Sequence, residues 1–177
     1  IMLKFSLENP IYFKLGSYVE CNFGLFEVCD LQKPAFNTNT AGYDYELRLD
    51  AYYWKWKNKI FKYTPETTGQ EASWNLTAPL DVQAGIVLRN LKALGYTYKG
   101  QDFVFSIDST VENKSQLMSY DNINILDACF EMAKKWDCEC WVTENIIHFG
   151  RCESGDAVDF EIGKNVQEMS QSESQST

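Results

Sequence analysis

The chain has 177 residues and a mass of 20.4 kDa, with 45% apolar and 23% charged residues, a composition typical of globular proteins with one domain or two small ones. Its 25 acidic and 16 basic residues give a net charge of −9, which argues against binding to nucleic acids or anionic membrane surfaces. The apolar runs are too short for a membrane span. The single histidine, His148, excludes catalytic triads and multi-histidine metal sites built from this chain alone.

Residues 1–63 predict an antiparallel β domain, because short alternating runs follow one another with no helical period between them. The clearest run is 43–51, where every second residue is apolar and the residues between are charged, as in a strand with one buried face. Further strands are expected at 1–7, 18–21, 25–29 and 59–63, with a turn at 22–24. This pattern favours a small antiparallel β-barrel or sandwich-like domain.

Residues 64–73 contain no large apolar side chain, and we place a linker there. Residues 74–163 then predict a small α+β domain with two helices. The first helix is capped by Thr77, has Pro79 in its first turn and ends at Gly95. One apolar stripe runs along it, made of Leu80, Ala84, Val87, Leu88, Leu91 and Leu94. The second helix begins near Asn122 or Asn124 and carries Leu126, Cys129, Phe130, Ala133 and Trp136 on one face.

The remaining strands of this domain are expected at 96–98, 103–107, 138–143, 145–149 and 158–162. Residues 164–177 hold no aromatic side chain and end in a Ser/Gln-rich stretch, which predicts a disordered tail or a linker. The predicted fold class is therefore α+β and β-rich.

No constellation of catalytic, cofactor-binding or metal-binding residues emerges from the sequence. The six cysteines are expected to be free thiols, because Cys138 and Cys140 lack the usual two-residue spacing of a zinc knuckle. A zinc site using these two thiols with Cys152 and His148 is the alternative. Acids such as Asp127 and Glu139 are numerous, but no spacing singles out a glycosidase pair. We predict no enzyme activity and no cofactor.

The most distinctive surface candidate is the aromatic run that follows the clearest strand. If period two continues, Tyr52, Trp54 and Trp56 lie together on an exposed face and form an interface. The alternative is that a neighbouring domain of the same chain covers this strand.

The order of segments resembles the hub proteins of phage tail tips and baseplates, in the tail-associated or prophage endopeptidase tail group. In the first half, Lys14 to Val19 occupies the place of a glycine turn and strand, although Ser17 replaces the usual acidic residue, and Tyr43 to Leu47 matches a Y-x-Y-x-L strand. In the second half, Asn124 to Trp136 matches the family's n-x-l-d-A-L helix, and Cys140 to Gly150 matches the hairpin that follows it.

The resemblance implies a virion structural protein, prophage-encoded and made in the bacterial cytoplasm, that forms a homo-oligomer, a trimer, at the end of the tail tube. Its implied partners are other phage tail proteins, and its implied role is tail assembly and host-wall penetration. Because relatives have sequence before this β half and the chain starts at Ile1, we expect a fragment, with any wall-degrading domain elsewhere. Two alternatives stay open: a carbohydrate-binding module that uses exposed aromatics, and part of a peptidoglycan hydrolase.

Overall fold

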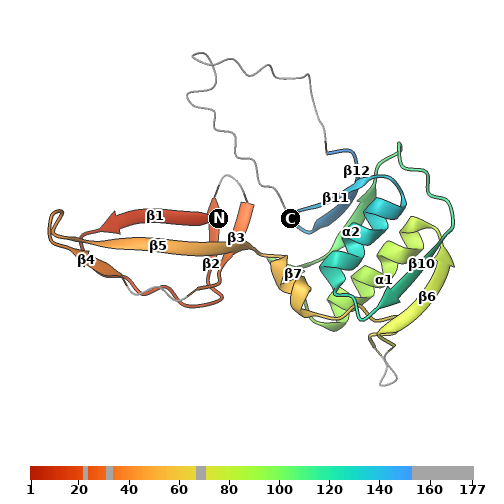
Figure 1. Ribbon diagram of the computed structural model, residues 1–177, viewed down its shortest axis with the longest axis horizontal. Helices are drawn as coiled ribbons and strands as arrows, with labels where there is room; N and C mark the ends of the chain where they lie inside the picture. Colours follow the sequence, from red (N-terminus) through yellow and green to blue (C-terminus); the bar gives the residue numbers. More distant parts are fainter. Residues whose placement is uncertain (22–23, 31–33, 67–70, 153–177) are drawn as a thin grey trace, which may run out of the picture.

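A computed structural model describes residues 1–21, 24–30, 34–66 and 71–152. The chain forms two parts, an N-terminal sheet and a larger α+β part, which meet where strand β5 ends (Figure 1). The predicted β-rich α+β class is confirmed. The predicted turn residues 22–23, the last strand at 158–162 and the tail at 164–177 lie outside the described residues.

The N-terminal sheet is antiparallel and has the strand order β1-β5-β3-β2, with β4 paired to β5 beside β3. It curls into half a barrel. Its strands are β1 (Met2–Leu7), β2 (Tyr18–Cys21), β3 (Gly24–Val28), β4 (Ala35–Asn37) and β5 (Gly42–Ala51). The long central strand β5 is thus paired on both sides, whereas β1 and β2 form the edges among the described residues.

The period-two prediction for 43–51 is confirmed, because alternate residues of β5 are buried. Tyr45, Leu47 and Leu49 are buried on one face, and Glu46 and Arg48 on the other face are exposed. The buried residues form a small core with Phe26 and Val28 of β3, and Phe5, Phe13, Val19 and Ala51 pack against it. The connection between β1 and β2 covers part of this face, since Phe13 packs edge-on against Tyr45 and the Tyr45 hydroxyl donates to the Ile11 carbonyl at 2.9 Å.

The predicted continuation of the strand beyond residue 51 is wrong. Residues Trp54–Asn58 form a short 3₁₀ helix, η1, in which the Trp56 N–H donates to the Tyr53 carbonyl at 3.0 Å. The expected strand at 59–63 is reduced to an isolated bridge between Ile60 and Asn124. The chain turns here because the side chains of this segment fill the core of the α+β part.

In the α+β part, two helices lie between a two-stranded ribbon and a three-stranded sheet (Figure 1). The helices are α1 (Leu80–Ala93) and α2 (Ile125–Lys135), and the ribbon pairs β6 (Ser73–Ala78) with β10 (Gln116–Asp121). The sheet has the order β11-β12-β9, in which β9 (Val104–Ile107) runs parallel to β12 (Ile146–Gly150) and β11 (Glu139–Thr143) forms the predicted hairpin with β12. Strands β7 (Thr97–Tyr98) and β8 (Gln101–Asp102) form a small hairpin after α1.

Both predicted helices exist, but the start of the first one needs correction. Thr77 lies in strand β6, and Pro79 is the N-cap residue with extended backbone. The predicted N-terminus of the second helix is confirmed, since the Asn124 side chain caps α2 by accepting a hydrogen bond from the Asp127 N–H at 2.9 Å. Among the residues predicted to form the apolar stripes of the two helices, Leu94 and Phe130 are exposed, and the others are buried or half-buried.

Packing changes directly after β5, earlier than the predicted linker at 64–73. Tyr52, Trp56 and Phe61 belong to the larger core together with side chains from α1 and α2, and not to the small core of the sheet. The division of the chain into two domains stays a prediction. The N-terminal sheet has little core of its own and is joined to the α+β part through an aromatic junction.

Candidate functional site

The three residues predicted to form an exposed interface do not share a face. Tyr52 and Trp56 are 7% and 0% exposed, so the prediction that they line a surface is wrong. Trp54 points outward, with 42% of its surface exposed and the Lys57 ammonium 4.5 Å from its ring centre. The alternative reading of the sequence, in which the same chain covers this segment, is the one that the burial supports.

Tyr52 is the aromatic anchor of the junction between the two parts. Its ring lies parallel to that of Phe103 at a centroid distance of 6.4 Å, and its backbone N–H donates to the Leu25 carbonyl of β3 at 3.2 Å. Its hydroxyl donates to the backbone carbonyl of Glu144 in the β11–β12 turn. Burial raises the pKa of the Tyr52 hydroxyl, so this group stays protonated and remains a hydrogen-bond donor.

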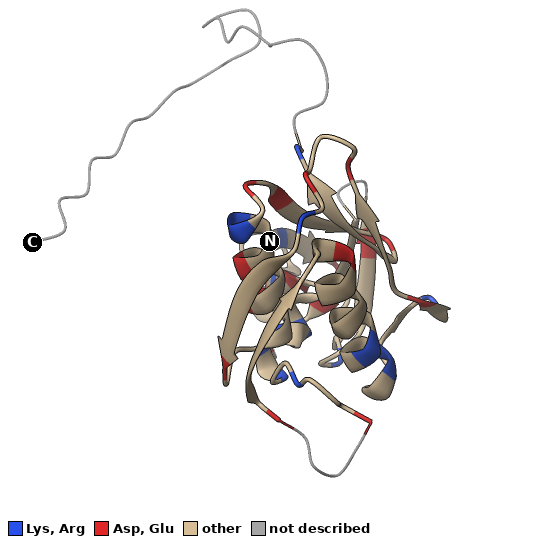
Figure 2. Cartoon of the chain, turned by 90° about the vertical axis from the view of Figure 1, so that its right-hand side faces the viewer, with Lys and Arg blue, Asp and Glu red and all other residues tan. Residues whose placement is uncertain are grey.

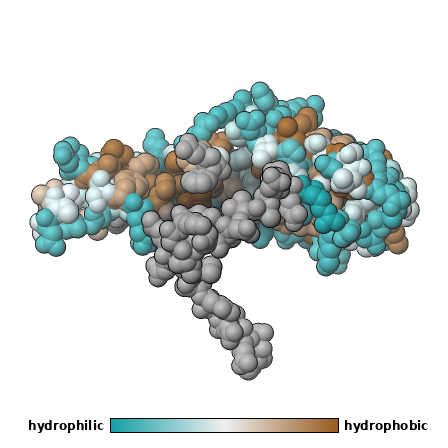
Figure 3. All heavy atoms as spheres, turned by 90° about the horizontal axis from the view of Figure 1, so that it is seen from above, coloured by the Kyte–Doolittle hydropathy of each residue, from teal (hydrophilic) through white to brown (hydrophobic). Residues whose placement is uncertain are grey.

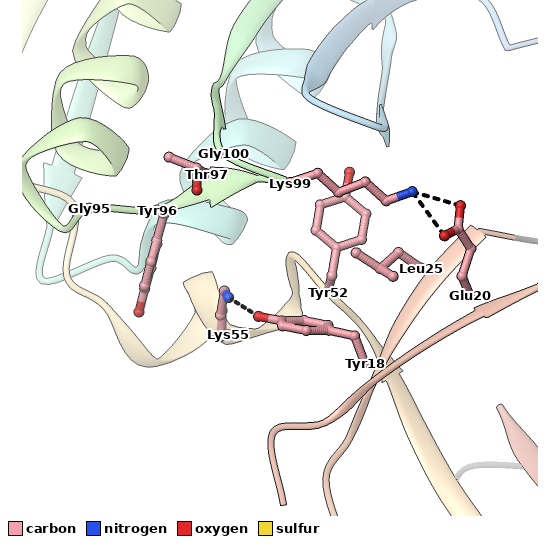
Figure 4. A pocket seen from close by; sticks show the side chains of 10 residues that line it. All are labelled: Tyr18, Glu20, Leu25, Tyr52, Lys55, Gly95, Tyr96, Thr97, Lys99 and Gly100. Atoms are coloured by element: carbon pink, nitrogen blue, oxygen red, sulfur yellow. Dashed lines mark hydrogen bonds and ion pairs between the residues drawn. The ribbon is translucent and has the colours of Figure 1, made fainter.

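A cleft of about 570 Å³ opens beside Tyr52, between β2 of the sheet and the turn after α1 (Figure 4). Figure 4 shows the rings of Tyr18, Tyr52 and Tyr96 around this cleft, with Lys55 of η1 between Tyr18 and Tyr96. Leu25 and the backbone of the glycine-containing turns complete the walls. The cleft therefore combines aromatic walls with charged side chains from both parts of the molecule.

Each lysine of the cleft has partners within it. The Lys99 ammonium donates to both carboxylate oxygens of Glu20 at 2.8 and 2.9 Å, and hydrogen bonding to Glu20 raises the pKa of Lys99. The Lys55 ammonium donates to the Tyr18 hydroxyl at 2.9 Å and lies 3.9 Å from a carboxylate oxygen of Glu27. The charged residues that line the cleft are thus two lysines and one glutamate, and Glu27 lies outside the lining.

No pattern in the sequence predicts this cleft. Its charged and aromatic residues come from β2, η1 and the segment after α1, and no spacing connects them along the chain. Only the position of the sheet against the α+β part brings Glu20 and Lys99 together, 79 residues apart in sequence.

The acids considered as catalytic candidates have structural partners. The Asp127 carboxylate accepts a hydrogen bond from the Asn124 side chain at 2.6 Å, at the N-terminus of α2. The Glu139 carboxylate accepts from the Cys152 N–H at 2.6 Å. These contacts explain both acids without catalysis, and the absence of enzyme activity stays a prediction.

The residues of the alternative zinc site lie on different sides of the β11–β12 hairpin. His148 stacks on Trp141 at a centroid distance of 5.0 Å, and burial lowers its pKa. On the other side, burial raises the pKa of Cys138, which favours the thiol over the metal-binding thiolate. Within the described residues no group of three or more His, Cys, Asp or Glu side chains is placed to hold a metal ion.

The edge of the N-terminal sheet carries consecutive exposed apolar side chains. Ile1, Met2 and Leu3 are 53%, 50% and 38% exposed, and β1 pairs only with β5 among the described strands. Figure 3 shows apolar side chains gathered along the sheet. The basic and acidic residues of the α+β part are instead interspersed over its helices and strands (Figure 2). No helix in the described ranges is long and apolar enough to cross a membrane.

Comparison with known proteins gives one structural likeness. No family model and no curated protein sequence matches the chain. Among solved structures, the chain is similar to the prophage tail protein gp18 from Listeria monocytogenes EGD-e, with a TM-score of 0.47 and 14% sequence identity. The likeness covers 85% of this chain and 40% of the Listeria chain, so this chain spans less than half the length of that protein.

Proposed function

We propose that the chain is a structural component of a phage or prophage tail, at the tail tip or baseplate hub, where it assembles into a trimer. The order of strands, helix and hairpin that resembles this family supports the proposal. The role in host-wall penetration is part of the same proposal and follows from a position at the end of the tail. No catalysis is assigned to this segment.

The observation that carries the proposal is the edge of β1, which pairs only with β5 among the described strands. Ile1 and Leu49 exchange both backbone hydrogen bonds, at 2.7 and 2.8 Å. Because bonded pairs alternate along an antiparallel ladder, Leu3, Phe5 and Leu7 bond to β5, and the backbone groups of the residues between them point away from the sheet. An edge of this kind is a template for pairing with another chain.

The side chains at this edge also favour association over solvation. Exposed edges of monomeric proteins are commonly protected by charged side chains or proline. In contrast, β1 begins with Met2 and Leu3, Ile1 precedes it, and all three side chains are apolar and exposed. Lys4 is the charged residue of β1, and its ammonium lies 3.0 Å from the Glu46 carboxylate on the same sheet. A copy of the chain placed beside β1 would cover these apolar side chains and extend the half barrel.

The test uses a pair of variants at one position. Lys4→Pro removes an outward N–H group while leaving the ladder to β5, and Lys4→Ala removes the same side chain but keeps the N–H. We expect a trimer by light scattering for the wild type and Lys4→Ala, and a folded monomer for Lys4→Pro. A wild-type chain that stays monomeric at high concentration, or a trimer that Lys4→Pro leaves intact, contradicts the proposal.

A further inference from the structure

Two cysteines meet where helix α2 packs against the β11–β12 hairpin (Figure 1). Cys129 lies on the buried face of α2 and is 1% exposed. Cys140 lies in β11, and because side chains alternate along a strand it points away from the Trp141 side of the sheet and packs against the larger core. The two side chains are hydrogen-bonded to each other. A pair of thiols therefore joins two elements of the α+β part.

This contact meets the geometric condition for a disulfide. The six cysteines, which all lie among the described residues, are free thiols in the structure. Two thiols in contact can reach an S–S distance of about 2 Å by side-chain rotation with little movement of the backbone. A bond between Cys129 and Cys140 would therefore form within the existing packing of α2 against β11.

The remaining cysteines are placed less favourably. Cys21 and Cys29 are exposed in the N-terminal part, and Cys152 is exposed after β12. Cys138 comes two residues before Cys140 in the sequence. Because residues two apart in extended backbone are separated by about 6.6 Å, a bond between these two thiols would bend the start of β11.

The two thiols of the pair differ in reactivity. Hydrogen bonding to Cys140 and burial raise the pKa of Cys129, so its thiolate is scarce and it reacts slowly with an oxidant in solution. Cys140 is half-buried and more accessible. Oxidation is therefore expected to begin at Cys140.

We propose that Cys129 and Cys140 form an intramolecular disulfide when the chain passes from a reducing to an oxidising environment. The oxidant is a small disulfide such as glutathione disulfide. The Cys140 thiolate attacks one sulfur of the oxidant, whose S–S bond breaks and releases one thiol. Cys129 Sγ then attacks Cys140 Sγ and displaces the second thiol. Two cysteine thiols are thus oxidised to one disulfide, and the oxidant is reduced to two thiols, which carry the two protons.

The bond would fasten α2 to the strand that supports the junction between the two parts. Strand β11 leads directly into the turn whose Glu144 carbonyl accepts the hydrogen bond from the Tyr52 hydroxyl. Oxidation would therefore stabilise the hairpin that holds this anchor. The inference is independent of the proposed trimer, because neither cysteine lies at the β1 edge.

The test compares the reduced 177-residue chain with the same chain incubated with glutathione disulfide. Free thiols are alkylated in denaturant, and the peptides are mapped by mass spectrometry without reduction. We expect a cross-linked peptide that joins Cys129 to Cys140, and an alkylated Cys138. Because the bond restricts the unfolded chain, the melting temperature should rise by about 5–10 °C and fall back when dithiothreitol is added.

Variants separate this bond from reactions at the surface. A chain with Cys21→Ser, Cys29→Ser and Cys152→Ser cannot form mixed disulfides at the exposed thiols and should keep the whole shift. In this background Cys140→Ser should abolish the difference between the oxidised and reduced forms, and Cys138→Ser, the matched control, should preserve it. The proposal is overturned if Cys129 remains open to alkylation after prolonged oxidation, if Cys138 is cross-linked in its place, or if Cys140→Ser keeps the shift.

Discussion

The buried side-chain amide of Asn90 pairs with the backbone of Lys62 as a neighbouring strand would. The Lys62 N–H donates to Asn90 Oδ1 at 3.0 Å, and Asn90 Nδ2 donates to the Lys62 carbonyl at 2.8 Å. Asn90 is 1% exposed, and its Nδ2 also donates to the Ile86 carbonyl at 2.9 Å. This amide therefore fastens the segment after η1 to helix α1.

Replacing Asn90 should be strongly destabilising. Asn90→Leu keeps a side chain of similar size but removes both hydrogen bonds to the Lys62 backbone, and we expect a loss of about 2–4 kcal/mol in the free energy of unfolding. Urea denaturation measures this loss. Lys92→Ala, an exposed change on the same helix, should cost less than about 0.5 kcal/mol. Equal effects of the two changes would show that the Asn90 pairing does not stabilise the fold.

The sequence predicts the elements whose period is long and whose two faces differ in polarity. Strand β5 and the two helices meet this condition, and all three exist. The sequence does not predict the β6–β10 ribbon, although Trp74, Leu76 and Ala78 alternate with exposed residues. Six residues offer too short a period to distinguish a strand from the segment that leads into a helix, and the sequence analysis instead predicts Thr77 as a helix cap.

The aromatic run after β5 shows why the candidate site could not be predicted. In a strand, Tyr52, Trp54 and Trp56 would share one face, but packing against the α+β part turns the chain and buries the first and third. A run of tyrosine, tryptophan and lysine permits either backbone, so tertiary contacts decide. The cleft depends on the same contacts, and the residues that line it are therefore scattered in sequence.

The two tryptophans of η1 should respond very differently to truncation. Trp56→Ala empties a fully buried site, and we expect a loss of about 3–5 kcal/mol. Trp54→Ala removes an exposed ring and should cost less than about 1 kcal/mol in the free energy of unfolding. Urea denaturation of both variants tests the burial, and a Trp56→Ala variant as stable as Trp54→Ala would contradict it.

The Trp54→Ala variant also tests what remains of the predicted interface. If Trp54 belongs to an interface between copies, the variant should keep its stability but lower the mass found by light scattering at a fixed concentration. An unchanged mass would remove Trp54 from the interface and leave the β1 edge as the contact surface.

The pKa of the Asp44 carboxyl group should depend on the pairing of β5, which carries Asp44, with β1 and β4. Its carboxylate accepts hydrogen bonds from Ser6 of β1 at 2.5 Å and from Asn37 of β4 at 2.8 Å, and these bonds lower its pKa. Because the pKa is lower in the folded than in the unfolded chain, this contribution to stability is present above about pH 4 and is lost as the pH falls through the lowered value.

The Ser6→Ala variant should raise the pKa of Asp44 toward its ordinary value, as followed by NMR of the carboxyl carbon. Ser119→Ala, an exposed serine on β10, is the matched control and should leave the Asp44 titration unchanged. A pKa of Asp44 that does not move in Ser6→Ala would show that the β1–β5 hydrogen bond is absent in solution.

The junction between the two parts should depend on the buried ring of Tyr52 and not on the ion pair beside it. The Lys99 and Glu20 side chains are 49% and 61% exposed, and exposed pairs contribute only about 0–1 kcal/mol. Lys99→Met should therefore leave both the stability and the small-angle scattering curve nearly unchanged.

Tyr52→Phe removes the hydrogen bond to the Glu144 carbonyl and should cost about 1 kcal/mol. Tyr52→Ala also removes the packing against Phe103 and should cost about 3–5 kcal/mol. Since the Tyr52 side chain reaches from the end of the sheet to the β11–β12 turn, its loss should also let the sheet move relative to the α+β part and raise the radius of gyration. A larger change for Lys99→Met than for Tyr52→Ala would mean that the surface ion pair, and not the aromatic anchor, fixes the two parts.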